Sequence, residues 1–123
     1  MVFSELSRRV IGCAIEVHRV LGPGLLELTY ERCLLHELKL AGIGFGNQHP
    51  LPVKYKGEVL DCGYRLDFLV ENQLVVELKS AERITGVHEA QLLTYLKLGG
   101  FRQGLLINFN VRRLRDGLKS YIN

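Results

Sequence analysis

The spacing of apolar residues along the chain changes between a helical and a strand pattern. In residues 4–21 and 26–40, apolar side chains recur every three or four positions, which predicts two amphipathic helices. The segment Gly22-Pro23-Gly24 separates them, because proline and glycine interrupt helices. A third helix is predicted for residues 86–98 and ends at Gly99-Gly100.

Shorter apolar runs bounded by turn residues predict strands. These predicted strands cover residues 51–56, 59–70, 74–80 and 104–110. Pro50 and Pro52 place the first of them at an edge of the sheet or confine its pairing to one side, since proline cannot donate to a neighbouring strand. The helix between the last two favours their parallel pairing. The order α-α-β-β-β-α-β therefore indicates an α/β fold with a mixed sheet.

The end of the chain carries a further turn signal. Asp116-Gly117 is a hairpin-type turn between two short segments, residues 112–115 and 118–122. We therefore expect residues 111–123 to form a short β-tail.

Three charged residues interrupt the most apolar of the predicted hairpins. If Glu71-Asn72-Gln73 forms the turn, Asp67 lies opposite Glu77 on the neighbouring strand. Side chains alternate along a strand, so Glu77 and Lys79 share one face with Asp67. Charges are costly in an apolar sheet unless they are paired or bind a metal. The hairpin thus predicts two carboxylates and an ammonium on one patch.

Metal-assisted phosphodiester hydrolysis uses this set of groups. Carboxylate oxygens suit Mg²⁺ or Mn²⁺, which polarises a phosphate and lowers the pKa of bound water. A lysine can orient that water or offset developing negative charge. A simpler alternative stays open at this point, in which Glu77 and Lys79 form a salt bridge on a solvent-facing strand edge.

The hairpin resembles the core of the PD-(D/E)XK nuclease superfamily. Asp67 matches the aspartate and Glu77-Leu78-Lys79 matches E-x-K, while Arg65-Leu66 replaces the proline that usually precedes the aspartate. Upstream, residues 24–30 read G-x-x-E-x-x-Y, which is similar to the signature of the small GxxExxY proteins, a branch of that superfamily. Downstream, residues 88–96 resemble the branch's helix carrying a glutamine.

This resemblance implies a restriction-endonuclease-like core, a central mixed β-sheet flanked by helices, and a metal-dependent nuclease acting on DNA. It assigns the metal, Mg²⁺ or Mn²⁺, to Asp67, Glu77 and the backbone carbonyl near Leu78. Lys79 would assist the attacking water. The full set of expected catalytic residues is Asp67, Glu77, Lys79, Gln91 and Glu27.

Two of these residues have a structural alternative. By the resemblance, Glu27 points toward the metal patch, yet a glutamate in the first turn of a helix also complements the helix dipole. Gln91 lies on one stripe of its helix with His88 and Tyr95, where it would position the phosphate. The alternative for Gln91 is a hydrogen-bonding residue on the helix surface.

Composition limits the remaining choices. A chain of 123 residues with 47% hydrophobic and 24% charged residues is expected to form a single globular domain, residues 1–123. It has no apolar run of ~18 residues and no signal peptide, so we expect a cytoplasmic protein without a membrane span. Cys13, Cys33 and Cys62 are too widely spaced to indicate a zinc site and are expected to be free, buried thiols.

The charge pattern permits a nucleic-acid partner. The net charge is +3, and basic residues cluster near the C-terminus at Arg112, Arg113, Arg115 and Lys119, where a solvated tail is the alternative. The small size leaves little surface for wrapping duplex DNA, which favours a homodimer. Glycine-rich nucleotide loops and Ser-His-Asp arrangements do not occur in the sequence.

A second function class also fits these observations. The chain could be a non-catalytic accessory module that keeps the nuclease fold and binds nucleic acid or another protein. Metal binding and a cleavage assay distinguish the two functions.

Overall fold

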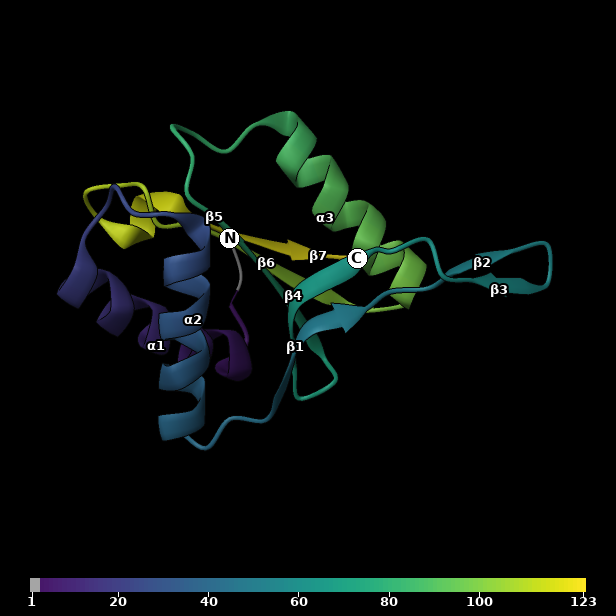
Figure 1. The fold of residues 1–123 in the computed structure, drawn as a ribbon, viewed down its shortest axis with the longest axis horizontal. Helices are drawn as coiled ribbons and strands as arrows, with labels where there is room; N and C mark the ends of the chain where they lie inside the picture. Colours follow the sequence, from purple (N-terminus) through teal and green to yellow (C-terminus); the bar gives the residue numbers. More distant parts are fainter. Residues whose placement is uncertain (1–2) are drawn as a thin grey trace.

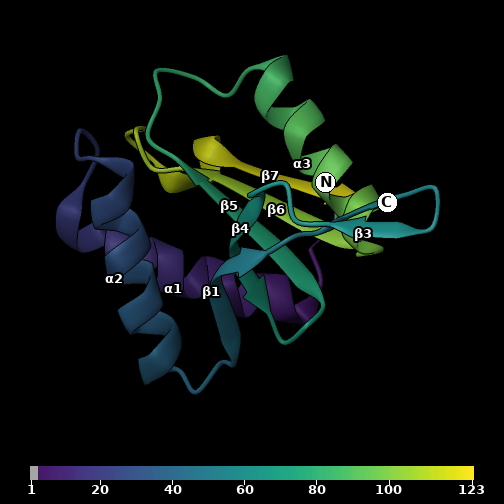
Figure 2. The same cartoon turned by 45° about the vertical axis from the view of Figure 1, so that its right-hand side comes forward.

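The computed structural model describes residues 3–123 and forms three layers (Figure 1). Helices α1 (Glu5–Leu21) and α2 (Glu27–Leu40) cover one face of a five-stranded sheet, and α3 (Gly86–Gly99) covers the other (Figure 2). The strands, in spatial order, are β1 (Phe45–Pro50), β4 (Arg65–Val70), β5 (Leu74–Lys79), β6 (Gln103–Asn108) and β7 (Leu118–Ile122). None of the helices in residues 3–123 combines the length and apolar character needed to cross a membrane.

The sheet is mixed, as the sequence predicts. β1, β4 and β5 pair antiparallel, β6 runs parallel to β5, and β7 is antiparallel to β6. The predicted parallel pairing across α3 is therefore confirmed. The three cysteines are also free thiols, as expected, but only Cys13 is buried, since Cys33 is half-buried and Cys62 is exposed. The predicted burial is therefore wrong for Cys33 and Cys62.

Two apolar clusters, one on each side of the sheet, hold the layers together. The cluster against α1 and α2 receives Phe68, Val70, Leu74, Val76, Leu78, Leu105 and Ile107 from the sheet. The cluster against α3 receives Leu66, Leu69, Val75 and Leu106. Side chains alternate along β5, so Glu77 and Lys79 lie on the same side as Val75, the side that α3 covers.

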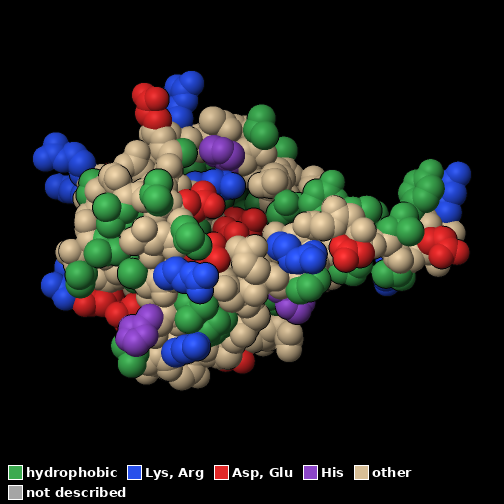
Figure 3. Space-filling view, viewed as in Figure 1, with side chains coloured by type: hydrophobic (Ala, Val, Ile, Leu, Met, Phe, Trp, Pro, Cys, Tyr) green, Lys and Arg blue, Asp and Glu red, His purple; other side chains and the backbone are tan. Residues whose placement is uncertain are grey.

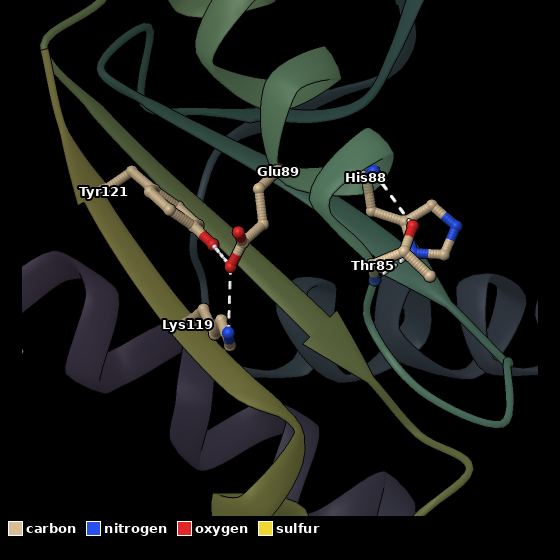
Figure 4. A network of polar contacts seen from close by, with 5 residues as sticks. All are labelled: Thr85, His88, Glu89, Lys119 and Tyr121. Carbon is tan, nitrogen blue, oxygen red and sulfur yellow. Dashed lines mark hydrogen bonds and ion pairs between the residues drawn. The ribbon is translucent and has the colours of Figure 1, made fainter.

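Polar contacts at the first turn of α3 fix this helix on the sheet (Figure 4). Thr85 and His88 form a reciprocal capping box, in which each side chain accepts the other residue's backbone N–H. Glu89 accepts hydrogen bonds from Lys119 (2.8 Å) and Tyr121 (2.6 Å) of β7. These bonds lower the pKa of Glu89 and connect the helix to the edge strand. His88 is thus used for capping.

The first strand of the sheet lies earlier in the chain than the sequence suggests. Residues 45–50 form the edge strand, and residues 51–56 do not join the sheet, so that part of the prediction is wrong. Instead β2 (Val53–Tyr55) and β3 (Glu58–Leu60) form a separate two-stranded ribbon that projects from the body (Figure 1). Lys56 and Gly57 both have positive φ, 48° and 84°, and such turns favour tight local hairpins.

The C-terminal segment also differs from its prediction. Residues 112–115 do not pair with residues 118–122; a short 3₁₀ helix, η1 (Leu114–Gly117), precedes β7, which pairs with β6. Gly117 lies so close to the Asn108 carbonyl that a Cβ would collide with it, which explains a glycine here. Lys119 therefore belongs to the sheet and not to a solvated tail.

Candidate metal-binding site

The hairpin of β4 and β5 has the register that its sequence predicts. Residues 71–73 form the turn, and Val70 pairs with Leu74. The regular pairing continues to Phe68 and Val76. The next two residues, Asp67 and Glu77, lie opposite each other. Here hydrogen bonds from the backbone to carboxylate side chains replace the bonds between the two backbones.

Each of the two carboxylates accepts a hydrogen bond from the backbone of the opposite strand. The backbone N–H of Asp67 donates to Oε2 of Glu77 at 2.7 Å, and the N–H of Leu78 donates to Oδ2 of Asp67 at 2.8 Å. Each carboxylate is thereby fixed by the backbone of the opposite strand. The expected convergence of Asp67 and Glu77 on one patch is confirmed.

Burial strengthens the electrostatic coupling at this patch. Glu77 is only 5% exposed, and burial, followed by repulsion from Asp67, raises its pKa to about 8. Burial also raises the pKa of Asp67. The attraction of Lys79 lowers both pKa values but does not reverse either shift. Simultaneous ionisation of both carboxylates is therefore unfavourable without a cation, and a bound cation would favour it.

The donor set fits a hard divalent cation. One oxygen of each carboxylate accepts a backbone N–H. The other two oxygens, Oδ1 of Asp67 and Oε1 of Glu77, could bind a metal, and Oδ1 also accepts a longer hydrogen bond from Gln48 at 3.3 Å. The Lys79 carbonyl accepts the N–H of Phe109 on the β6 side, so by strand alternation the backbone of Leu78 faces β4 and the patch. Oxygen donors of this kind suit Mg²⁺ or Mn²⁺.

A larger metal site, built from three or more His, Cys, Asp or Glu side chains, is absent from the described part of the chain, residues 3–123. Two carboxylates and a carbonyl would leave further positions for water and a phosphate oxygen, as is usual for Mg²⁺.

The salt-bridge alternative disagrees with the structure. β5 is an inner strand of the sheet, with β4 on one side and β6 on the other. Within residues 3–123, no ion pair joins Glu77 to Lys79. Glu77 is therefore a buried acid, not a residue of a solvent-facing edge.

Glu27 lies within electrostatic reach of the same patch. It is the first residue of α2, and its pKa is raised by burial, lowered by Lys79 and raised by Asp67. A glutamate that merely complemented the helix dipole would not need these neighbours. The structure thus brings Glu27 toward Asp67 and Lys79.

Gln91 makes no direct polar contact with the two carboxylates among the described residues. Its side chain is exposed, and no hydrogen bond within residues 3–123 connects it to the two carboxylates. Tyr95, one turn further along α3, is 8% exposed, and its pKa is raised by burial and by Glu77. Tyr95 is therefore the residue of this stripe that lies within electrostatic reach of Glu77, and the position of Gln91 at the patch stays a prediction.

The tyrosine of G-x-x-E-x-x-Y has a structural role. Tyr30 is fully buried and stacks on Phe109 with ring centroids 4.5 Å apart. Its hydroxyl donates to the Gly22 carbonyl (2.6 Å) and accepts the Leu25 N–H (3.2 Å). Ser80 donates to the Leu25 carbonyl at 2.6 Å, which ties the same loop to the end of β5.

Tyr30→Phe should destabilise the protein by about 1–3 kcal/mol, because it leaves the Gly22 carbonyl and the Leu25 N–H without their shared partner. The measurement is the free energy of unfolding in urea. Tyr121→Phe removes a hydroxyl from the part-buried bond to Glu89 and serves as the matched control, with a smaller expected loss. Equal losses in the two variants would contradict this role of Tyr30.

Sequence reasoning missed three residues beside Asp67. Glu31 is 7% exposed and accepts hydrogen bonds from Asn47 (3.2 Å) and Gln48 (3.0 Å), and Gln48 also reaches Oδ1 of Asp67 at 3.3 Å. Glu31 follows Glu27 by one helical turn, a spacing that places both on one side of α2. That spacing could have identified Glu31, whereas nothing in the sequence marks the two amides.

The surface agrees with a charged site open on one side. Asp and Glu side chains gather in the centre of the face seen in Figure 3, where α2, α3 and β4 meet, and Lys or Arg side chains lie beside them. A phosphate that approached from this side would meet the acidic groups and their basic neighbours together.

Comparisons with known proteins agree with this arrangement. A family model described as the PD-(D/E)XK nuclease superfamily matches residues 4–121. Searches of curated proteins and of solved structures gave no match. The matched region includes both strands of the central hairpin and all three α-helices. The chain therefore belongs to the PD-(D/E)XK nuclease superfamily.

Proposed function

We propose that this protein is a divalent-metal-dependent nuclease that hydrolyses phosphodiester bonds of DNA. The observation that carries the proposal is the pair of hydrogen bonds across the hairpin, from the Asp67 N–H to Glu77 and from the Leu78 N–H to Asp67, which fixes a buried and a half-buried carboxylate on one patch. Superfamily membership supports a nuclease activity.

The chain's own groups have distinct tasks in this proposal. Asp67, Glu77 and the carbonyl of Leu78 would hold Mg²⁺ or Mn²⁺. When bound, such an ion polarises a phosphate and makes a water more acidic. Lys79 offsets negative charge on the attacked phosphate and orients the attacking water.

Two further residues act from the rim of the patch. Glu27 accepts hydrogen bonds from water around the carboxylate pair, and Gln91 contacts the phosphate from the exposed surface of α3. Because the Gln91 side chain is exposed, it meets substrate when DNA lies along α3. A homodimer would supply the contact surface that one small chain lacks.

Incubation with labelled nucleic acids tests the proposal. Duplex, single-stranded and four-way-junction DNA, together with RNA, are compared in Mg²⁺, in Mn²⁺ and in chelator. We expect cleavage of at least one DNA substrate, with full loss in chelator. A protein that cleaves none of them would contradict the nuclease, and retained nucleic-acid binding would then favour the accessory module.

A further inference from the structure

The edge strand β1 is distorted at the position opposite Asp67. Asn47 pairs with Phe68 and His49 pairs with Leu66, which leaves Gln48 opposite Asp67 without a regular pair. Gln48 has φ 51°, a left-handed conformation that is unfavourable for residues other than glycine. Such strain often accompanies a functional site.

The distortion changes where two neighbouring side chains point. Consecutive residues of a regular strand face opposite sides of the sheet. Here Asn47 and Gln48 both donate to the same oxygen, Oε2 of Glu31, at 3.2 and 3.0 Å. The left-handed residue thus brings both amides to one side.

Each side-chain amide donates a second hydrogen bond to Asp67. Asn47 donates to the backbone carbonyl of Asp67 at 2.8 Å, and Gln48 donates to its Oδ1 at 3.3 Å. Glu31 therefore orients two donors, one of which holds the main chain of Asp67 and the other its carboxylate. We call Glu31, Asn47 and Gln48 the amide cluster.

We propose that the amide cluster is a positioning device for Asp67, with Gln48 as the residue that sets the direction of its carboxylate toward the cation. The inference rests on the proposed function, because it assumes that Asp67 is a metal ligand. Groups that hydrogen-bond to a metal ligand fix its orientation, and their loss typically weakens metal binding 10–100-fold.

Gln48→Gly provides the decisive variant. Glycine accepts the left-handed conformation without strain, so the fold is expected to be kept, while the amide is lost. Asn72→Gly is the matched control, since Asn72 also has positive φ (56°) but lies in the turn at the other end of the hairpin. The affinity for Mn²⁺ is measured from the free-ion signal in electron paramagnetic resonance, and thermal melting reports the fold.

We expect Gln48→Gly to bind Mn²⁺ at least about tenfold more weakly than wild type, with a melting temperature that is unchanged or raised. Asn72→Gly should show the same thermal behaviour with unchanged affinity. Equal Mn²⁺ affinities in Gln48→Gly and wild type would overturn the positioning role and leave the proposed function standing. A wild type that binds no Mn²⁺ would overturn the proposed function and the positioning role together.

Variants of Glu31 separate positioning from direct ligation. Glu31→Gln keeps an oxygen acceptor of the same reach, so it should retain more Mn²⁺ affinity than Glu31→Ala. Equal losses in both would indicate that the charge of Glu31 acts on the cation itself, and this result would overturn the amide cluster.

Discussion

Asp67→Asn should abolish metal-dependent cleavage while the protein stays folded. Asparagine keeps an oxygen that can accept the Leu78 N–H, but it lacks the charge that a cation requires. A metal contributes several kcal/mol to charge stabilisation, so the rate is expected to fall by about 10³-fold or more. The measurement is single-turnover cleavage of the DNA substrate that wild type cuts fastest.

Glu77→Gln and Lys79→Ala should give losses of similar size. In the proposed function the two carboxylates and the lysine act as one catalytic unit, so a double variant should be little slower than either single variant. Glu82→Gln, a change at an exposed acid after β5, is the control and should cleave like wild type. Thermal melting completes the test, because removing a buried charge from an apolar sheet often leaves stability unchanged or raises it. Unchanged cleavage by Asp67→Asn would contradict its assignment as a ligand.

The stability of the metal-free protein should fall as the pH rises from about 5 to 8. The pKa of Glu77 is raised from 4.5 to about 8, so between these values the folded state holds a proton that the unfolded state has released. Ionisation of Glu77 is then penalised only in the folded state. At ~1.4 kcal/mol for each pH unit, the total penalty reaches at most about 5 kcal/mol and stays constant above pH 8.

Glu77→Gln isolates this effect, since glutamine cannot ionise. The difference in unfolding free energy between wild type and Glu77→Gln, measured in urea at several pH values, should grow in favour of the variant up to pH 8. Asp67, whose pKa is also raised, contributes with the same sign in both proteins. Saturating Mn²⁺ should remove the decline, because cation binding favours the ionised carboxylates. A pH-independent difference would contradict the raised pKa.

The geometry of the central hairpin was predictable because it depends on only two features of the sequence, the length of the turn and the alternation of side chains along each strand. A three-residue turn fixes the register, and the period of two along a strand then decides which charges share a face. The same reasoning could not find the amide cluster, since the orientation of Asn47 depends on a left-handed φ at its neighbour Gln48. No local pattern predicts that conformation for a glutamine.

Long-range packing explains the remaining errors. Gly46, Asn47 and Pro50 make residues 45–50 a poor strand by composition, and the pairing of β1 with β4 compensates for this. In α3, periodicity places Gln91 and Tyr95 on one stripe, but the depth of each residue depends on how the helix packs on the sheet, and Tyr95 is buried while Gln91 is exposed. The packing of Leu92, Tyr95 and Leu96 against the sheet, unknown from sequence, sets that position, and the contacts from β7 to Glu89 add to it.

The ribbon of β2 and β3 leaves the sheet and returns to it at nearly the same point. Pro50 pairs with Arg65, and the Leu51 N–H donates to the Tyr64 carbonyl at 3.0 Å. The chain is therefore closed at the base of the ribbon, and residues 52–63 form a self-contained insertion. Such an insertion can be lengthened, shortened or exchanged without moving Asp67. A chain built this way can acquire new substrate contacts in one segment while the carboxylate pair stays the same.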